Sequence, residues 1–476
     1  MPIIIPANSA AGGGYEVDNS LRFNTASTDY LTRAASAFGT PTNRKKCTIS
    51  FWCKRSSLTV QQAVMGVETT PAGGSNEARL ILRGDDTLEL YDYQSGYKFR
   101  YITNRVFRDT SAWLHIVFSV DTTHPTGSAR VNLYINGVAE TSFSSTTDPA
   151  QDLDTFLNSG NYVQLGRQST GNSYYGGYLS EYVFIDGSAL APTDFGEFDE
   201  DSGIWKPKSV SGLSFGTNGF YLEFGNSGAL GTDSSGAGNT FTPVNLTALN
   251  QATDTCTNNF ATLNYLAQNN SGVILKEGNT KMSITSNVGQ RNYVSTIAMT
   301  SGKWYFEAKM DNVGTNNSGS APYVGVMAYP NYLGNQYVGT TGGAGYNTGG
   351  YIYSNDGSAT NTNTSYTDAD IIGCAVDLDN SKIYWSKNGT YVNAGSGIGN
   401  PSTGANGYDI ANIRNGDMAL CVSGFNINAE WACNFGNPYY SISSSNSDAN
   451  DFGNFEYTVP TGYFALCSKN LSEALS

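Results

Sequence analysis

The chain has 476 residues, including 54 glycines, 31 tyrosines and 22 phenylalanines, and only 14% of its residues are charged. This composition favours short strands separated by turns over helices, and the length suits two domains of roughly 200 residues each. The formal net charge is −14 and the longest basic run is Arg44 to Lys46, so we expect no nucleic-acid partner. No stretch approaches the roughly 20 apolar residues of a membrane span, so we expect no membrane insertion.

The seven cysteines are an odd number, and none of them shows the C-x2-C spacing of a zinc site. Several lie in or beside apolar runs, where a reduced thiol behaves as a small hydrophobic side chain. We therefore expect buried free thiols, no disulfide framework, no metal and no cofactor.

Residues 1–19 are predicted to form an N-terminal arm. Ile3 to Ile5 is flanked by Pro2 and Pro6, and the segment lacks the basic region and apolar core of a signal peptide. A short apolar segment of this kind can add to the sheet edge of a neighbouring subunit. We expect the arm to contact other subunits.

Residues 20–200 are predicted to form a first β-sandwich, because short apolar runs recur there every ten to twenty residues. The clearest runs are 47–53, 79–82, 87–91, 113–120, 130–135, 162–165 and 178–185. Residues 201–263 are rich in Gly, Ser, Asn and Thr and are predicted to form a connector. The connector also carries Trp205, Phe220, Tyr221, Phe224 and Phe260, so we expect it to be partly packed.

Residues 264–476 are predicted to form a second β-sandwich. Its clearest apolar runs are 281–284, 303–310, 323–329, 371–378, 382–386, 418–423 and 430–435. Between them, residues 331–367 have no sustained apolar periodicity and are predicted to form a long loop, a type of segment that is usually functional or mobile.

The two halves share one local pattern. Val120-Asp121 precedes a polar turn, a strand and Asn136-Gly137, and Val376-Asp377 precedes a polar turn, a strand and Asn388-Gly389. Asn-Gly provides the positive φ angles that a two-residue hairpin turn requires. The sequence therefore predicts an all-β fold of two tandem antiparallel sandwiches that are variants of one topology.

Four segments of the first half resemble the laminin G-like (concanavalin A-like) family in order, over roughly residues 20 to 190. They are Thr48 to Cys53, Trp113 to Asp121, Leu133 to Gly137 and Gly177 to Asp186. The second half resembles the SPRY family, another concanavalin A-like jelly roll, through Gly302 to Glu307 and Ile372 to Gly389. The long Asn/Gly/Thr loops depart from animal SPRY domains, so their peptide-binding surface is not carried over.

This pairing of domains resembles appendage and surface proteins of bacterial viruses. The resemblance implies a bacteriophage virion structural protein, such as a homo-oligomeric tail fibre, spike or surface appendage, on the virion surface. The arm would then contact other virion subunits, and the ligand would be a host-surface glycan. A capsid decoration or connector protein without a ligand is the first alternative, and a polysaccharide hydrolase is the second.

The sequence offers no convincing catalytic or metal set. The two histidines are His115, inside an alternating strand, and His124, in a turn composition. The pairs Asp85/Asp86 and Asp377/Asp379 are more typical of turn residues at strand ends than of a glycosidase pair. The laminin G-like resemblance would allow Asp121 as a calcium ligand, but a strand-end turn explains Asp121 equally well. A calcium site at Asp377, Asp379 and Asn380 lacks the D-x-D-x-D-G loop with its distal Glu. We therefore expect a protein that is not an enzyme.

Tyrosines surrounded by Asn, Ser, Thr and Gly remain as candidate ligand-binding residues. A tyrosine ring can pack on the C–H face of a sugar while neighbouring amides and hydroxyls bond its hydroxyl groups. The alternative is that these rings cover the sandwiches or lie at a subunit interface. The candidates are Tyr174, Tyr175, Tyr332, Tyr337, Tyr346, Tyr351 and Tyr353.

Overall fold

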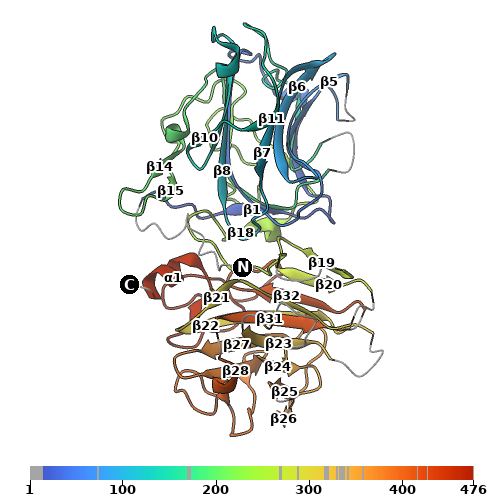
Figure 1. Ribbon diagram of the computed structural model, residues 1–476, viewed down its shortest axis with the longest axis vertical. Coiled ribbons are helices and arrows are strands. Elements are labelled where there is room, and N and C mark those ends of the chain that lie inside the picture. The colour runs from blue at the N-terminus through green and yellow to red at the C-terminus, as the bar shows by residue number, and fades with distance from the viewer. Residues whose placement is uncertain are drawn as a thin grey trace. The chain divides into compact units, whose positions relative to one another are not determined.

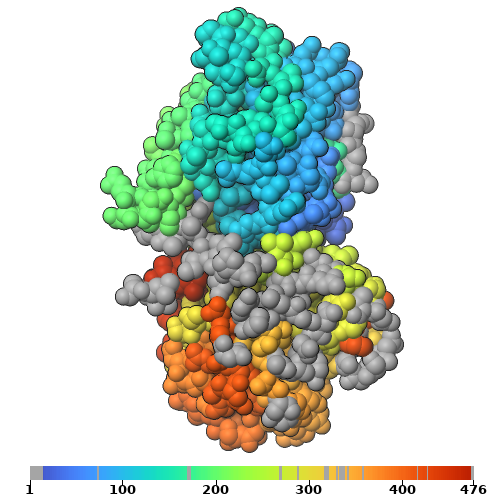
Figure 2. Space-filling model, in the orientation of Figure 1, coloured from blue at the N-terminus to red at the C-terminus, as the bar shows by residue number. Residues whose placement is uncertain are grey.

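The structure is a computed structural model that describes residues 14–71, 74–168, 173–266, 271–286, 289–315, 321–328, 331, 338–339, 342–355, 357, 359–414, 416–425 and 427–474. The described residues up to Thr257 form one compact unit, the first unit, and those from Asn258 form the second unit. In Figures 1 and 2 the first unit is coloured blue to green and the second yellow to red. Both consist of sheets that are antiparallel except for one short parallel strand pair in the second unit, which confirms the predicted fold class.

The first unit contains two large sheets and one small one. The inner sheet has the order β10-β9-β8-β3-β13-β1-β18, with β16 beside β13, and the outer sheet has the order β11-β7-β6-β5-β4-β12-β2-β17. The strands of the inner sheet are β1 (Ser20–Phe23), β3 (Lys46–Arg55), β8 (Leu114–Asp121), β9 (Val131–Ile135), β10 (Val138–Glu140), β13 (Gly177–Asp186), β16 (Phe220–Leu222) and β18 (Gln251–Ala252). Those of the outer sheet are β2 (Tyr30–Arg33), β4 (Gln62–Glu68), β5 (Asn76–Leu82), β6 (Thr87–Gln94), β7 (Tyr97–Val106), β11 (Phe143–Thr147), β12 (Tyr162–Leu165) and β17 (Thr242–Val244), and β14 (Gly196–Phe198) pairs with β15 (Trp205–Pro207).

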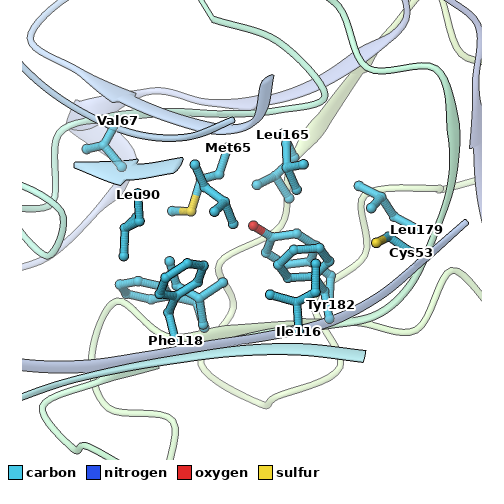
Figure 3. Close-up of a cluster of buried hydrophobic side chains, with 14 of the residues drawn as sticks. Cys53, Met65, Val67, Leu90, Ile116, Phe118, Leu165, Leu179 and Tyr182 are labelled. Atoms are coloured by element: carbon cyan, nitrogen blue, oxygen red, sulfur yellow. The ribbon is translucent and has the colours of Figure 1, made fainter. Parts of the chain in front are cut away.

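The core of the first unit lies between its two large sheets, because alternate residues of each strand point inward. Figure 3 shows Ile116, Phe118 and Tyr182 of the inner sheet facing Met65 and Leu90 of the outer sheet. All of these side chains are buried. The predicted alternation in residues 113–120 therefore corresponds to a strand with one face in the core.

The second unit is also built from two sheets. One has the order β19-β20-β32-β22-β27-β28-β29, with β30 beside β28 and β33 beside β22, and the other has the order β21-β31-β23-β24-β25-β26. The strands of the first are β19 (Val273–Lys276), β20 (Lys281–Ile284), β22 (Lys303–Asn312), β27 (Ile371–Asp377), β28 (Lys382–Lys387), β29 (Thr390–Tyr391), β30 (Tyr408–Asp409), β32 (Glu430–Asn434) and β33 (Phe464–Ala465). Those of the second are β21 (Arg291–Met299), β23 (Tyr323–Ala328), β24 (Gly343–Asn347), β25 (Tyr351–Ser354), β26 (Ala359–Asn361) and β31 (Met418–Gly424).

Helix is scarce in the described part of the chain. The α-helix is α1 (Ser468–Ala474), and the 3-10 helices are Ala35–Ala37, Gly127–Ala129, Pro192–Asp194, Ala248–Asn250 and Ala411–Ile413. Over the ranges that the structure describes, no helix is long and apolar enough to cross a membrane.

Most of the predicted connector, residues 201–263, lies within the first unit. Its segments supply β15, β16, β17 and β18, of which the last three extend the two large sheets. From the predicted arm, Tyr15 and Val17 pack there too, and the Val17 amide donates to Thr257 Oγ1 at 3.1 Å. Residues 1–13 of the arm lie outside the described residues.

The region 331–367 is not one long loop, which corrects the sequence-based prediction. Its described residues form β24, β25 and β26. An added Cβ on Gly343 would lie 2.2 Å from the Val338 carbonyl oxygen, and one on Gly345 would lie 2.8 Å from Val338 Cγ1. Glycine is required because another segment passes close to the strand, and this requirement removes the apolar alternation that identifies a strand in a sequence.

The shared pattern of the two halves is confirmed in the structure. Asn136 and Gly137 have φ angles of 48° and 76°, and Asn388 and Gly389 have φ angles of 47° and 79°. Asn136 Oδ1 accepts a hydrogen bond from the His115 amide at 2.8 Å, and Asn388 Oδ1 accepts one from the Ile371 amide at 2.9 Å. In both units the donor lies on the first strand of the hairpin. The sheet order β10-β9-β8-β3-β13 in the first unit matches β29-β28-β27-β22-β32 in the second.

Candidate binding site

A row of side chains crosses the outer sheet of the first unit on the side away from the core. The strand register places Gly66 opposite Arg79, Arg79 opposite Tyr91, and Tyr91 opposite Arg100. Their strand neighbours Leu80 and Leu90 are in the core, so this row points outward. We call this surface the outer face; it comprises Tyr30, Glu68, Glu77, Arg79, Glu89, Tyr91, Tyr93, Tyr97 and Arg100, with Arg167, Gln168 and Tyr174 from the segment after β12.

The carboxylates of the outer face are paired with guanidinium groups. Arg79 Nη2 lies 3.1 Å from Glu68 Oε1 and 2.5 Å from Glu77 Oε2. Glu89 accepts hydrogen bonds from Arg83 at 2.7 Å and from Arg100 at 2.6 Å. Glu68, Arg79, Glu89, Tyr91 and Gln168 are themselves buried. The accessible part of the face consists of Tyr30, Glu77, Tyr93, Tyr97, Arg100, Arg167 and Tyr174.

Aromatic rings at one end of this face are partly exposed. The ring of Tyr97 lies edge-on to Tyr91 and Tyr93, with centroid distances of 5.4 and 5.3 Å, and its side chain is 46% exposed. The Arg100 guanidinium lies 4.7 Å from the centre of the Tyr97 ring. A register shift between β6 and β7 turns Tyr97 onto this face. The exposed part of the Tyr97 ring offers an apolar surface beside a hydrogen-bond donor.

A second aromatic cluster lies where β2 meets the segment after β12. The Arg167 guanidinium lies 4.8 Å from the Tyr30 ring centre and 5.5 Å from that of Tyr174. Gln168 Oε1 accepts a bond from Arg79 Nη1 at 3.1 Å, which ties this segment to the row. Gly66 permits the close approach, because an added Cβ would lie 3.2 Å from the Arg167 carbonyl oxygen.

Tyr174 is the one sequence-based candidate that lies on this face, and the other residues of the face were not among the candidates. The available signal was the alternation of polar and apolar residues in 76–82 and 87–94, which places Glu77, Arg79, Glu89, Tyr91 and Tyr93 on one side. Tyr175 is fully buried, and its hydroxyl lies 3.2 Å from the Tyr178 carbonyl oxygen. Its ring belongs to the core and is not accessible to a ligand.

The structure separates the candidate tyrosines of the second unit. Tyr346 is fully buried, donates its hydroxyl to the Thr364 carbonyl and packs 5.0 Å from the Tyr366 ring. Burial raises the pKa of Tyr346 to about 12. Tyr351 is 38% exposed, and its ring lies 6.3 Å from that of the half-buried Tyr353. Tyr332 and Tyr337 lie outside the described residues.

His115 lies within β8, which confirms the predicted strand, and its side chain is buried. Trp205 Nε1 donates to its Nδ1 at 2.9 Å, and its Nε2 lies 2.9 Å from Ser50 Oγ. Because Nδ1 accepts a bond, the neutral ring carries its proton on Nε2 and donates it to Ser50. Burial lowers the pKa of His115 to about 3, so the ring stays neutral.

The aspartates that the sequence analysis considered as possible glycosidase pairs form turn hydrogen bonds and ion pairs. Asp86 is buried between Arg55 at 3.2 Å and Arg108 at 2.9 Å, and Asp85 Oδ1 accepts from the Thr87 amide at 3.2 Å. Asp379 Oδ1 accepts from the Gly302 amide at 2.8 Å.

Asp121 and Asp377 occupy equivalent positions in the two units. Asp121 lies 2.9 Å from Lys46, its partner across the strands, and Asp377 lies 3.2 Å from Lys303 in the same register. Within the described ranges, no group of three His, Cys, Asp or Glu side chains is placed to hold a metal ion.

Comparison with known proteins identifies two domain families. A family model described as the concanavalin A-like lectin/glucanases superfamily matches residues 24–194, and a SPRY domain model matches residues 303–396. No curated protein sequence matches the chain.

Solved structures of low identity are similar to parts of the chain. The SPRY domain of human HERC1 is 20% identical, with 34% of this chain and 91% of that chain covered and a TM-score of 0.25. A Bacteroides ovatus protein proposed to bind carbohydrate is 16% identical, with 48% and 58% covered and a TM-score of 0.34. Domain 4 of the arabinanase AbnA from Geobacillus stearothermophilus, solved with arabinotriose, is 21% identical, with 33% and 66% covered and a TM-score of 0.24.

The first match lies within the first unit and the second within the second unit. The sheets of both units are mainly antiparallel, and the order of their hairpin strands is equivalent. The chain therefore carries a concanavalin A-like domain followed by a SPRY domain, both of them jelly rolls.

Proposed function

We propose that the protein binds glycans through the outer face of its first unit. The observation that carries this proposal is the pair of partly exposed clusters in which a guanidinium lies on a tyrosine ring, Arg100 on Tyr97 and Arg167 on Tyr30. Rings of this kind pack on sugar C–H faces, and the guanidinium and amide groups bond sugar hydroxyls. The concanavalin A-like lectin/glucanase fold of this unit is consistent with such a ligand.

We propose further that binding occurs without hydrolysis. Glycoside hydrolysis needs one carboxylic acid that donates a proton and a second carboxylate that acts as base or nucleophile. On the outer face, Glu68, Glu77 and Glu89 are each ion-paired with an arginine, so each carboxylate already has a partner within the protein. This arrangement supports recognition over acid–base catalysis.

Binding and hydrolysis are tested together by incubating the full chain with purified cell-surface polysaccharides. The proposal predicts that the protein sediments with at least one polysaccharide and that no new reducing ends form. Absence of binding to every polysaccharide at high micromolar protein would refute the binding role. Release of reducing ends would establish the hydrolase alternative.

We propose that the biological setting is the surface of a bacteriophage virion, with the protein as a homo-oligomeric appendage that attaches to a host. The support is the tandem of laminin G-like and SPRY sandwiches with long Asn/Gly/Thr segments. Immunogold labelling of particles tests this, since a few to some tens of copies at the tail fit an appendage. Hundreds of copies over the shell would instead identify a capsid decoration protein.

A further inference from the structure

The second unit contains a cleft of about 500 Å³ that the proposed function does not use. Tyr305 of β22 lies at its floor. Its walls come from the β28–β29 turn, from the segment 398–402 and from the loop 457–461. We call it the tyrosine cleft; its lining residues with side-chain polar groups are Tyr305, Ser386, Thr390, Tyr391, Asn400, Ser402, Tyr457, Thr458 and Thr461.

A buried carboxyl group fixes the 457–461 wall of the cleft. Glu307 accepts hydrogen bonds from the backbone amides of Glu456 at 3.0 Å and Tyr457 at 2.8 Å, and from the Tyr305 hydroxyl at 3.1 Å. The Tyr457 ring also lies against Gly389, where an added Cβ would be 2.7 Å from the ring. One buried group therefore holds both the floor and a wall, so the cleft is preorganised.

The opposite wall is fixed by a short turn. Asn400 Oδ1 accepts a bond from the Thr403 amide at 3.2 Å, and its backbone pairs with Ala405 in both directions. This uses the acceptor atom of the Asn400 side chain. Its Nδ2 donor group has no hydrogen-bond partner among the described residues.

The lining of the cleft is neutral but rich in hydrogen-bonding groups. It contains no Lys, Arg, His, Asp or Glu side chain. Within the part of the chain that the structure describes, its hydroxyl groups other than that of Tyr305 make no side-chain hydrogen bond; they belong to Ser386, Thr390, Tyr391, Ser402, Tyr457, Thr458 and Thr461.

We infer that the tyrosine cleft is a binding site for a neutral saccharide. Hydroxyl groups both donate and accept, and they match a ligand whose own groups do both. The rings of Tyr391 and Tyr457 supply apolar faces beside them. The cleft volume is in the range of small-molecule sites, roughly 300 to 1,000 Å³. A proline-rich peptide would also pack on aromatic rings. It has few hydrogen-bond donors, however, and would leave the hydroxyl oxygens of the cleft without donors.

This inference is independent of the outer face, which lies in the first unit, and the experiment keeps the two apart. The full chain is titrated with neutral trisaccharides of glucose, mannose, galactose and xylose, with binding followed by calorimetry or saturation-transfer NMR. Three variants are compared with the unmodified chain. Thr461→Trp fills the cleft, Asn400→Asp keeps the turn acceptor but removes the Nδ2 donor, and Ser396→Trp is an exposed control outside the lining.

At least one trisaccharide is expected to bind at millimolar concentration or below. Thr461→Trp should abolish this binding, Asn400→Asp should weaken it about tenfold through the loss of one bonding group, and Ser396→Trp should leave it unchanged. Melting curves equal to that of the unmodified chain show that each variant is folded. An outer-face variant, Tyr97→Ala, should not affect trisaccharide binding in the cleft.

Three results would overturn the inference. They are the failure of every trisaccharide to bind the unmodified chain, binding that Thr461→Trp leaves intact, and occupation of the cleft by a decaproline peptide in preference to all of the trisaccharides. The first result would leave polysaccharide binding by the outer face standing, so failure of the two proposals can be told apart.

Discussion

Glu181 occupies an unusual position for an acidic residue. It lies within β13 at a φ of 49°, next to a register shift, and its side chain is buried. The Tyr221 hydroxyl donates to it at 2.8 Å and the Tyr15 hydroxyl at 3.1 Å. Burial raises the pKa of Glu181 to about 7. The folded first unit therefore holds a proton that the unfolded chain releases at lower pH.

This raised pKa predicts how the stability of the first unit depends on pH. Between pH 4.5 and about 7 the folded state binds more protons than the unfolded state, so stability falls as pH rises through this window. Glu181→Gln should remove this loss and be more stable than the unmodified chain at pH 8, by about 3 kcal/mol. Denaturant unfolding of both chains at pH 4.5 and pH 8 measures this difference in the free energy of unfolding. A gain at pH 8 no larger than that of the exposed control Glu200→Gln would contradict the assignment.

The cysteines allow a second prediction at this scale. All seven are buried and free, and burial raises the pKa of each thiol, to about 12 for Cys53 and Cys467. Thiolate is the reactive form, so a disulfide reagent should label none of them in the native protein and seven in guanidinium chloride. Rapid labelling of any thiol without denaturant would show that its surroundings open.

At the residue scale, sequence reasoning placed His115 correctly because strand alternation defines which side of a strand a residue faces. It could not separate Tyr174 from Tyr175, which are adjacent and similar in composition. Which of the two is buried depends on the packing of Tyr175 against Phe23, a residue about 150 positions away. Long-range contacts of this kind are absent from local patterns.

The Asn-Gly turns are the elements that the sequence identified best. In both units an aromatic ring covers the glycine, since an added Cβ would lie 2.3 Å from Trp205 at Gly137 and 2.7 Å from Tyr457 at Gly389. Neither ring could be assigned from the sequence, because Trp205 lay in the predicted connector and Tyr457 lies outside the apolar runs that predicted the strands. The conformation of the turn is determined by the Asn-Gly dipeptide itself, whereas the ring that packs on its glycine is brought there by the tertiary fold.

Gly137→Ala tests this cover on one turn. The substitution introduces left-handed backbone strain, worth about 1 to 2 kcal/mol, and displaces Trp205 from its hydrogen bond to His115. We expect destabilisation of at least about 3 kcal/mol, in the range of overpacked cores.

Gly203→Ala is the matched control for this substitution. Its φ is 68°, and nothing lies within 4 Å of the added Cβ, so only the backbone cost of about 1 to 2 kcal/mol should appear. Equal losses in the two variants, measured by denaturant unfolding, would mean that the Trp205 contact contributes nothing.

At the scale of the whole molecule, each unit has its own hydrophobic core. The buried clusters of the first unit draw on residues between Val17 and Cys256, and those of the second on residues between Phe260 and Cys467. Domains of this size bury enough surface to fold alone. Residues 1–257 and 258–476, expressed separately, should each give a β-type circular dichroism spectrum and one cooperative melting transition. Failure of either half to melt cooperatively would show that it depends on the other.

The composition and the regular spacing of short apolar runs were sufficient to predict two all-β units, because both are properties of long stretches of the chain. The boundary was harder to predict. Residues 205–252 look like a connector in the sequence since their strands are only two or three residues long, too short for an alternation signal. Their contribution comes from pairing with strands far away in the sequence, such as β16 with β13.

The most direct test of glycan binding by the outer face is a comparison of three variants on one polysaccharide that the full chain retains. Tyr97→Ala and Tyr174→Ala each remove a ring that contacts an arginine, and Phe198→Ala removes an exposed ring elsewhere in the same unit. We predict that each tyrosine variant binds about tenfold more weakly and that Phe198→Ala binds normally. Unchanged binding by the double variant of Tyr97 and Tyr174, with its fold intact, would contradict it.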